Sequence, residues 1–393
     1  MAPPAPYFER KQDTVMPILD RYMLRQFVQV FVICFLSLTG LYIVIDAFSN
    51  LDEFIRGGKQ SGLLNVMGHY YAYQSVAFFD QTSSVLTLIS AMFAVTWIQR
   101  NNELTAIEAA GIPKSRVVVP VIVAVAVISV VSAVSREAVI PRIRTQLAMK
   151  PQDLDGSTGQ RFARQYDLET GILLGGAESF VDKQRIAAPD FLLPTGLSKH
   201  GKHLTAPEAL YRPAGANHPG GYLFRKVQQP RNITGELSLK LDGKPVVITP
   251  REAPWLAADE VFVVSQVSFE QLAGGSEWRK YSSTLELIRG LSNPSLENGA
   301  DVRVAIHARF VQPILDMTLL FLGLPLVLTK ENRNMFMAIG LCVLVVAMFM
   351  FVCWACQVAG AKYFDFVSPA LAAWLPLMLF VPWAVGISEP LRQ

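Results

Sequence analysis

The chain has 393 residues, of which 51% are hydrophobic and 17% are charged, so it is more apolar than an average soluble domain and its composition indicates a membrane protein. A net charge of +3 does not favour a nucleic-acid ligand, and no basic stripe interleaved with aromatic residues occurs along the chain. The four cysteines all lie within apolar runs, which argues against a disulfide framework, a zinc knuckle or another metal site.

Six apolar segments are long enough to cross a bilayer core of about 30 Å, which requires roughly 20 helical residues. Four of them contain no charged residue, and the other two contain one carboxylate each, Asp80 and Asp316. The first is longer than the apolar core of a signal peptide and lacks a cleavage site, so we expect a retained anchor. In chain order the segments are 26–45, 60–99, 117–135, 310–329, 334–361 and 366–388.

Lys and Arg are concentrated before the first segment, between the second and third, between the fourth and fifth, and at the C-terminus. Because cytoplasmic loops carry an excess of these residues, we expect both termini in the cytoplasm and the long polar segment on the outer side. The predicted organisation is a cytoplasmic segment 1–25, helices one to three at 26–139, an outer domain at 140–305 and helices four to six at 306–393.

The outer domain contains runs with the alternation and turn signals of β-strands, "GYLFRKV", "LSLKLDGKPVVITP" and "EVFVVSQVSFEQL". These runs predict a mostly antiparallel β sandwich or jelly roll. The stretch "STLELIRGLSN" has helical spacing and is expected to lead back to the membrane. The fold class is therefore an α+β membrane protein with six transmembrane helices, three plus three, and a β domain inserted between helices three and four.

A short charged helix is predicted at 101–111, between the second and third spans. Asn101 or Asn102 is suited to cap it, Glu103 lies in its first turn, where a carboxylate favours the helix dipole, and Gly111 and Pro113 provide the stop. A helix of about ten residues, roughly 15 Å long, is too short to be stable alone and must pack on something.

Leu104, Ile107 and either Ala110 or Gly111 fall on one side of this helix. Two interpretations stay open on the residues alone. The helix is either a capped turn between two spans or a docking element that fits a cytoplasmic partner, with Glu103 paired to a basic residue of that partner.

Three stretches resemble the lipopolysaccharide-export half-permeases of the LptF/LptG (YjgP/YjgQ) family, most closely its LptG branch. They are "ILDRYMLRQF" at 18–27, "RNNELTAIEAAGIPKSRVVVPV" at 100–121 and "HARFVQPILDMTLLFLGLPLVL" at 307–328. The order of three helices, an outer β domain and three helices is also similar over nearly the whole chain.

The resemblance implies a permease subunit, without enzymatic activity or a cofactor of its own, that extracts lipopolysaccharide from the inner membrane. It implies a second half-permease in a hetero- or homodimer, a cytoplasmic ABC ATPase, and a periplasmic bridge of β-jelly-roll proteins that receives the lipid. It also implies a lateral gate between helix one of one permease and helix five of the other. The ATPase-coupling residues would be Arg100, Asn102, Glu103, Leu104, Ile107 and Gly111.

Candidate substrate contacts lie near the outer ends of the spans. Arg136, Arg142 and Arg144 in "SREAVIPRIR" carry guanidinium groups that bind phosphate in a two-pronged manner. The alternative is that these arginines are ordinary interfacial anchors, paired with Glu137. Asp316 is a further candidate, because a carboxylate within a span is costly unless it is protonated, paired or faces a wet cavity. Asp80 raises the same question, and its role stays open.

Two features depart from the family pattern. Val76 and Ser84 stand where many relatives have prolines, which predicts a straighter second helix, and acidic residues gather at the outer end of helix one, where LptG members place lysines. The second feature leaves a less anionic glycolipid as an alternative cargo. A scaffold without transport and a membrane-embedded hydrolase are rival functions, but the hydrolase would need a catalytic cluster, and only His69 and His307 offer imidazoles near the spans.

Overall fold

The computed structural model describes residues 18–149, 151, 159–181, 183–194, 201–215, 218–231, 233–241, 243–296, 299–328, 335–362 and 367–388. Within these residues, six helices are long and apolar enough to cross a membrane, as predicted. They are α1 (Ile18–Ser49), α3 (Leu63–Arg100), α5 (Lys114–Val134), α9 (Ala300–Leu328), α10 (Met335–Lys362) and α11 (Pro369–Ile387).

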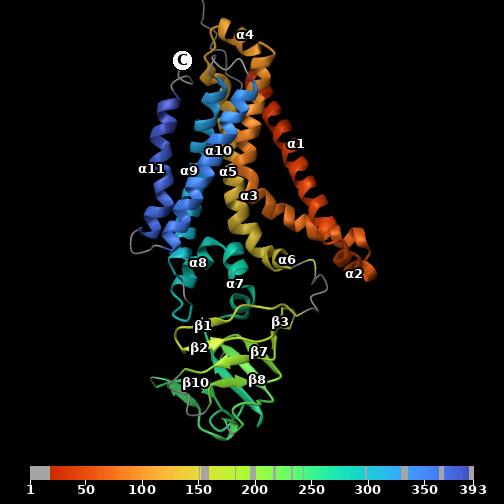
Figure 1. Ribbon diagram of the computed structural model, residues 1–393, viewed down its shortest axis with the longest axis vertical. Helices are drawn as coiled ribbons and strands as arrows, with labels where there is room; N and C mark the ends of the chain where they lie inside the picture. The colour runs from red at the N-terminus through yellow and green to blue at the C-terminus, as the bar shows by residue number, and fades with distance from the viewer. Residues whose placement is uncertain are drawn as a thin grey trace, which may run out of the picture.

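The short helix α4 (Glu103–Ala109) lies at one end of the bundle, together with the start of α1 and the end of α11, and the β domain lies beyond the opposite end (Figure 1). We call these the α4 end and the β end. The six spans therefore cross the bundle in alternating directions, which matches the predicted order.

Some helix boundaries differ from the predicted ones. Helix α1 begins at Ile18 and α9 at Ala300, because polar residues extend both helices beyond their apolar parts. The segment predicted at 60–99 is broken at Gly62, whose φ of 84° separates α3 from the preceding helix α2 (Leu51–Ser61). A positive φ is accessible to glycine without steric cost, so the chain changes direction there.

Helix α9 lies at the centre of the bundle and packs against α3, α5, α10 and α11. Its approach to α3 is close at Gly323, where an added Cβ would lie 2.4 Å from Cδ1 of Leu88. Helix α1 is peripheral and contributes to the bundle core mainly through Met23 and Phe27, near its α4 end. The rest of α1 exposes much of its apolar surface.

The end of α5 is irregular. The chain continues from Val134 as a π-helical turn η1 (Ser135–Val139), a 3₁₀ turn η2 (Ile140–Ile143) and the short helix α6 (Arg144–Ala148). Pro141 contributes to this irregularity because it has no N–H group for a regular helical hydrogen bond. Wide turns of this kind often occur at functional sites.

The outer domain is built from two antiparallel sheets, which confirms the predicted antiparallel β architecture. Their strand orders are β1-β2-β5-β6 and β3-β4-β7-β8-β11-β10-β9. A shared apolar core, centred on Phe191, Tyr222 and Phe224, fills the domain. The strands are β1 (Gln165–Asp167), β2 (Ile172–Leu174), β3 (Glu178–Phe180), β4 (Arg185–Ala187), β5 (Asp190–Leu192), β6 (His203–Thr205), β7 (Glu208–Arg212), β8 (Gly221–Arg225), β9 (Leu239–Leu241), β10 (Lys244–Ile248) and β11 (Glu260–Val264).

Two helices connect the sheets to the bundle (Figure 1). The run "EVFVVSQVSFEQL" is a strand only as far as Val264, because Ser268 and Gln271 form a capping box that starts α7 (Phe269–Tyr281). The predicted helix in "STLELIRGLSN" is confirmed as α8 (Thr284–Leu291), which begins at a second capping box formed by Ser283 and Glu286.

Candidate functional site

Helix α4 is shorter than the predicted 101–111, and its ends are formed differently. Asn102 occupies the N-cap position, but its φ of 57° is left-handed and its side chain makes no capping hydrogen bond, so the predicted side-chain cap is wrong. An N-cap side chain reaches the helix N–H groups from the extended conformation, which Asn102 does not adopt. At the other end, Gly111 N donates to Glu108 O and Ile112 N donates to Ile107 O, which is a Schellman stop.

Helix α4 is fixed to the bundle by apolar and polar contacts. Leu104 is buried in the bundle core and Ile107 packs against it. The Tyr22 hydroxyl of α1 donates to Oε2 of Glu103 at 3.0 Å. Close by, Arg116 of α5 pairs with Asp20 of α1 at 2.8 Å. Leu104 and Ile107 therefore hold α4 in place and do not face outward.

The outward face of α4 consists of small side chains. Thr105, Ala106, Ala109 and Ala110 are all exposed, and so is Gly111 beyond the end of the helix. Arg100, at the end of α3, is also exposed. A surface without long side chains allows another backbone to approach closely.

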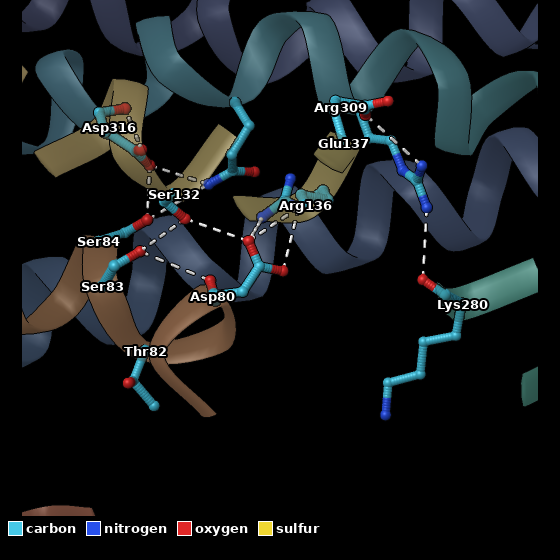
Figure 2. A network of polar contacts seen from close by, with 12 residues as sticks. Asp80, Thr82, Ser83, Ser84, Ser132, Arg136, Glu137, Lys280, Arg309 and Asp316 are labelled. Atoms are coloured by element: carbon cyan, nitrogen blue, oxygen red, sulfur yellow. Dashed lines mark hydrogen bonds and ion pairs between the residues drawn. The ribbon is translucent and has the colours of Figure 1, made fainter. Parts of the chain in front are cut away.

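A second group of polar side chains lies at the β end, where α3, α5 and α9 meet (Figure 2). Arg136, on the π-helical turn, forms a two-atom contact with Asp80 of α3, with Nε 3.0 Å from both carboxylate oxygens and Nη2 2.9 Å from Oδ1. The Ser132 hydroxyl donates to the same carboxylate at 3.1 Å. Asp80 is therefore the ion-pair partner of Arg136. Glu137, which was expected in this role, contacts other residues.

Asp316 lies in the middle of α9 and is 8% exposed. Its carboxylate accepts hydrogen bonds from Ser84 of α3 at 2.6 Å, from Ser129 of α5 at 2.7 Å and from Gln312 at 2.9 Å. Asp316 therefore joins three spans through neutral donors.

Glu137 connects the bundle to the outer domain. Its carboxylate accepts hydrogen bonds from the backbone N–H and the hydroxyl of Thr284, at the start of α8, at 2.7 and 2.6 Å. Arg309 of α9 lies 3.7 Å from Glu137 and donates to the backbone carbonyl of Ser282 at 2.7 Å. The π-helical turn thus directs Arg136 into the bundle and Glu137 toward α8.

These side chains line a pocket of about 460 Å³. Its polar wall contains Arg136, Glu137, Arg309 and Asp316, and its apolar rim contains Leu285, Ile288, Phe310 and Pro313. Its lining residues come from α3, α5, η1, α8 and α9. We call it the Asp316 pocket.

The other two arginines predicted as substrate contacts lie outside this pocket. Arg142 is exposed on η2. Arg144 is bound between Glu270 of α7 and Glu286 of α8, with 3.0 Å to the latter, so it ties α6 to the outer domain.

Sequence reasoning missed the hydroxyl and amide groups that surround the two carboxylates. Ser129 and Ser132 lie three residues apart, on one face of a helix, and Gln312 precedes Asp316 by four residues. These spacings in the sequence are a signal that could have identified the serines and the glutamine as partners of the two carboxylates. Ser84 was noted only because many relatives have a proline at its position, whereas in the structure its hydroxyl donates to Asp316.

The family comparison covers most of the chain. A family model described as lipopolysaccharide export system permease LptF/LptG matches residues 21–168 and 226–389. These ranges include α3, α4, α5, α9, α10 and α11 in full. A comparison with curated proteins found no match. The chain therefore belongs to the LptF/LptG family of lipopolysaccharide export system permeases and is a multi-pass transporter subunit of the inner membrane, not itself an enzyme.

Proposed function

We propose that this chain is the permease subunit of an ABC-type complex that extracts lipopolysaccharide from the inner membrane and passes it to a periplasmic bridge. A separate cytoplasmic ABC ATPase powers the step by docking on α4. The observation that carries the proposal is the family match over most of the chain, combined with an exposed α4 at the end of the bundle opposite the β domain. Both termini and α4 then lie in the cytoplasm.

The surface of α4 is suited to a docked partner. Exposed Ala106 and Ala109 allow close approach, while buried Leu104 keeps the helix attached to the bundle. Movement of α4 would reach α1 directly, because Tyr22 bonds Glu103. It would also reach α5 through the short connection at Gly111. Glu103 then acts through α1 as well as through contact with the ATPase.

The outer domain is suited to a bridge made of similar β domains. Strand β9 ends one sheet and β1 ends the other, whereas the opposite edges, β3 and β6, are partly covered by bridges to Gln160 and Gln229. Edge strands offer unpaired backbone groups to which another strand can add. The second half-permease would cover exposed apolar surface on α1 and α10, for example at Leu36 and Phe351.

One feature of the structure favours a cargo other than lipopolysaccharide with a heavily phosphorylated lipid A. At the β end of α1, Asp46 accepts a hydrogen bond from the Tyr71 hydroxyl at 2.9 Å, and Asp52 is exposed nearby on α2. Carboxylates at this site favour a glycolipid that carries less negative charge than a heavily phosphorylated lipid A.

The proposal is tested by capture of the cytoplasmic ABC ATPase of the export system on the purified, tagged chain. Ala106→Trp places a bulky group on the outward face without touching the core, and we expect it to abolish capture. Ala258→Trp, at an exposed alanine of the outer domain, is the matched control and should capture the ATPase normally. Glu103→Lys should weaken capture as well. Normal capture by Ala106→Trp would refute docking at α4.

A further inference from the structure

Five charged side chains meet at the β end of the bundle, and four of them form two pairs. Asp80 pairs with Arg136 at 2.9 Å, and Glu137 pairs with Arg309 at 3.7 Å. The fifth, Asp316, is in no ion pair with any residue that the structure describes. The cluster therefore has three carboxyl groups and two guanidinium groups, and Asp316, the carboxyl group without a cationic partner, is more than nine-tenths buried.

The Asp316 carboxylate retains capacity for one more donor. Oδ1 accepts from Ser84 and Gln312, but Oδ2 accepts only from Ser129. An ionised carboxylate offers about four acceptor sites. Because a buried carboxylate is costly without a nearby positive charge, the group that fits the remaining site is a cationic hydrogen-bond donor.

Arg136 provides a positive charge on the wall of the same pocket. Within the described part of the chain its Nε and Nη2 atoms contact Asp80, while Nη1 has no hydrogen-bond or ion-pair partner. Ser129 and Ser132, which bond Asp316 and Asp80, are three residues apart on α5, or about 4.5 Å along the helix axis. Ser132 bonds Asp80, the partner of Arg136, so the site for a cation at Asp316 and the site for an anion at Arg136 lie in one pocket.

The rim of the Asp316 pocket is apolar and exposed. Leu285, Ile288 and Phe310 are 55%, 44% and 63% exposed, and all three line the pocket. A volume of about 460 Å³ lies in the range of small-molecule sites and is far larger than a metal ion needs. Charged groups inside the pocket and apolar groups of α8 and α9 at its rim fit an amphiphile.

We propose that the Asp316 pocket binds the phosphoethanolamine headgroup of a bilayer phospholipid, with the ammonium group on Asp316 and the phosphate on Arg136. Two carbon atoms join these groups in the headgroup, so both groups fit within the one pocket that Asp316 and Arg136 line. The acyl chains leave over Leu285, Ile288 and Phe310. This inference goes beyond the proposed function, because it concerns a lipid held in the wall of one permease chain and not the exported cargo.

The test uses the full-length chain, stripped of lipid in detergent, and native mass spectrometry with phosphatidylethanolamine, phosphatidylglycerol and phosphatidylcholine at equal concentration. Phosphatidylglycerol has the phosphate without the amine, and phosphatidylcholine has methyl groups in place of the N–H donors. We expect phosphatidylethanolamine to bind at least about tenfold more tightly than either, as one charge-assisted hydrogen bond allows.

Three variants complete the test. Asp316→Asn should bind phosphatidylethanolamine and phosphatidylglycerol about equally, whereas Asp259→Asn, at an exposed carboxylate of the outer domain, should keep the preference for phosphatidylethanolamine. Ile288→Trp should block binding by filling the rim while the charged groups stay intact.

Equal binding of phosphatidylethanolamine and phosphatidylglycerol by the wild type, or an unchanged preference in Asp316→Asn, would overturn the proposal. Retention of an amine-bearing glycolipid, identified by its mass, would overturn the assignment to a phospholipid. Neither the ATPase nor transport enters this assay, so its failure is distinguishable from failure of the proposed function.

Discussion

The two carboxylates within the spans should respond in opposite ways to loss of their charge. Asp80 and Arg136 are 14% and 22% exposed in their side chains and share a two-atom contact, so Asp80→Asn leaves a guanidinium largely buried without its counter-charge. Removal of one partner of a buried pair costs 3–5 kcal/mol, and the residual exposure of Arg136 places the expected loss of unfolding free energy at about 3 kcal/mol.

Asp316→Asn should be almost neutral. The amide oxygen can still accept from Ser84 and Gln312, and the amide nitrogen can donate to the Ser129 hydroxyl. The variant also removes a buried charge that has no described ion-pair partner. We therefore expect a change within about 1 kcal/mol, with stabilisation as the expected sign.

The assay is unfolding of the purified chain in mixed micelles by titration with dodecyl sulfate, followed by circular dichroism. The double variant Asp80→Asn with Arg136→Gln should recover at least about half of the loss, because no guanidinium is then left unpaired. Asp52→Asn serves as the control for removal of an exposed carboxylate. A loss below about 1 kcal/mol for Asp80→Asn, or equal losses for Asp80→Asn and Asp316→Asn, would refute the reasoning.

Two further predictions concern a close packing contact and a buried hydrogen bond. Gly323→Ala places a methyl group 2.4 Å from Leu88 Cδ1 and should destabilise the bundle by about 1–3 kcal/mol in the same titration. Gly340→Ala is the control, because its added methyl group meets no atom within 4 Å, and it should not destabilise the bundle. Equal stability of the two variants would contradict the close approach of α3 and α9. Tyr222→Phe removes a hydroxyl that donates to a buried backbone carbonyl at 3.0 Å and should lower the free energy of unfolding by about 1–2 kcal/mol. Tyr166→Phe, at a 46% exposed residue, should change it very little. Thermal unfolding of both variants checks this, and a similar melting temperature for the two would count against a buried hydrogen bond.

The six spans and the outer β domain could be predicted from the sequence because their signals are local. A run of about 20 apolar residues has few alternatives to a transmembrane helix. Alternating runs bounded by glycine and proline are equally direct signals of strands. The break at Gly62 was missed because apolar residues continue on its far side, and only the backbone angle shows the change of direction.

The contacts of the candidate site could be predicted only in part. Asp80, Arg136 and Asp316 are recognisable one by one as costly charges near a membrane. Which charge pairs with which depends on the rotation of α3, α5 and α9 about their axes and on the π-helical turn at Ser135–Val139. Neither is encoded in a short stretch of residues, so the sequence suggested Glu137 where the structure has Asp80.

Helix α4 illustrates the same limit. Its position and its stop at Gly111 follow from local patterns, but its orientation does not. Leu104 and Ile107 form an apolar side that could equally face a partner or the chain's own bundle. In the structure they face the bundle, which leaves the side with Ala106 and Ala109 for a partner.

The central claim is that force from a separate ATPase enters this permease through the outward face of α4 and drives lipid extraction. The most direct measurement is ATP-dependent release of lipopolysaccharide from proteoliposomes that contain the assembled export complex. We expect the complex with Ala258→Trp to release lipid at the wild-type rate and the complex with Ala106→Trp to release none above the level without ATP. Wild-type release by Ala106→Trp would contradict the account.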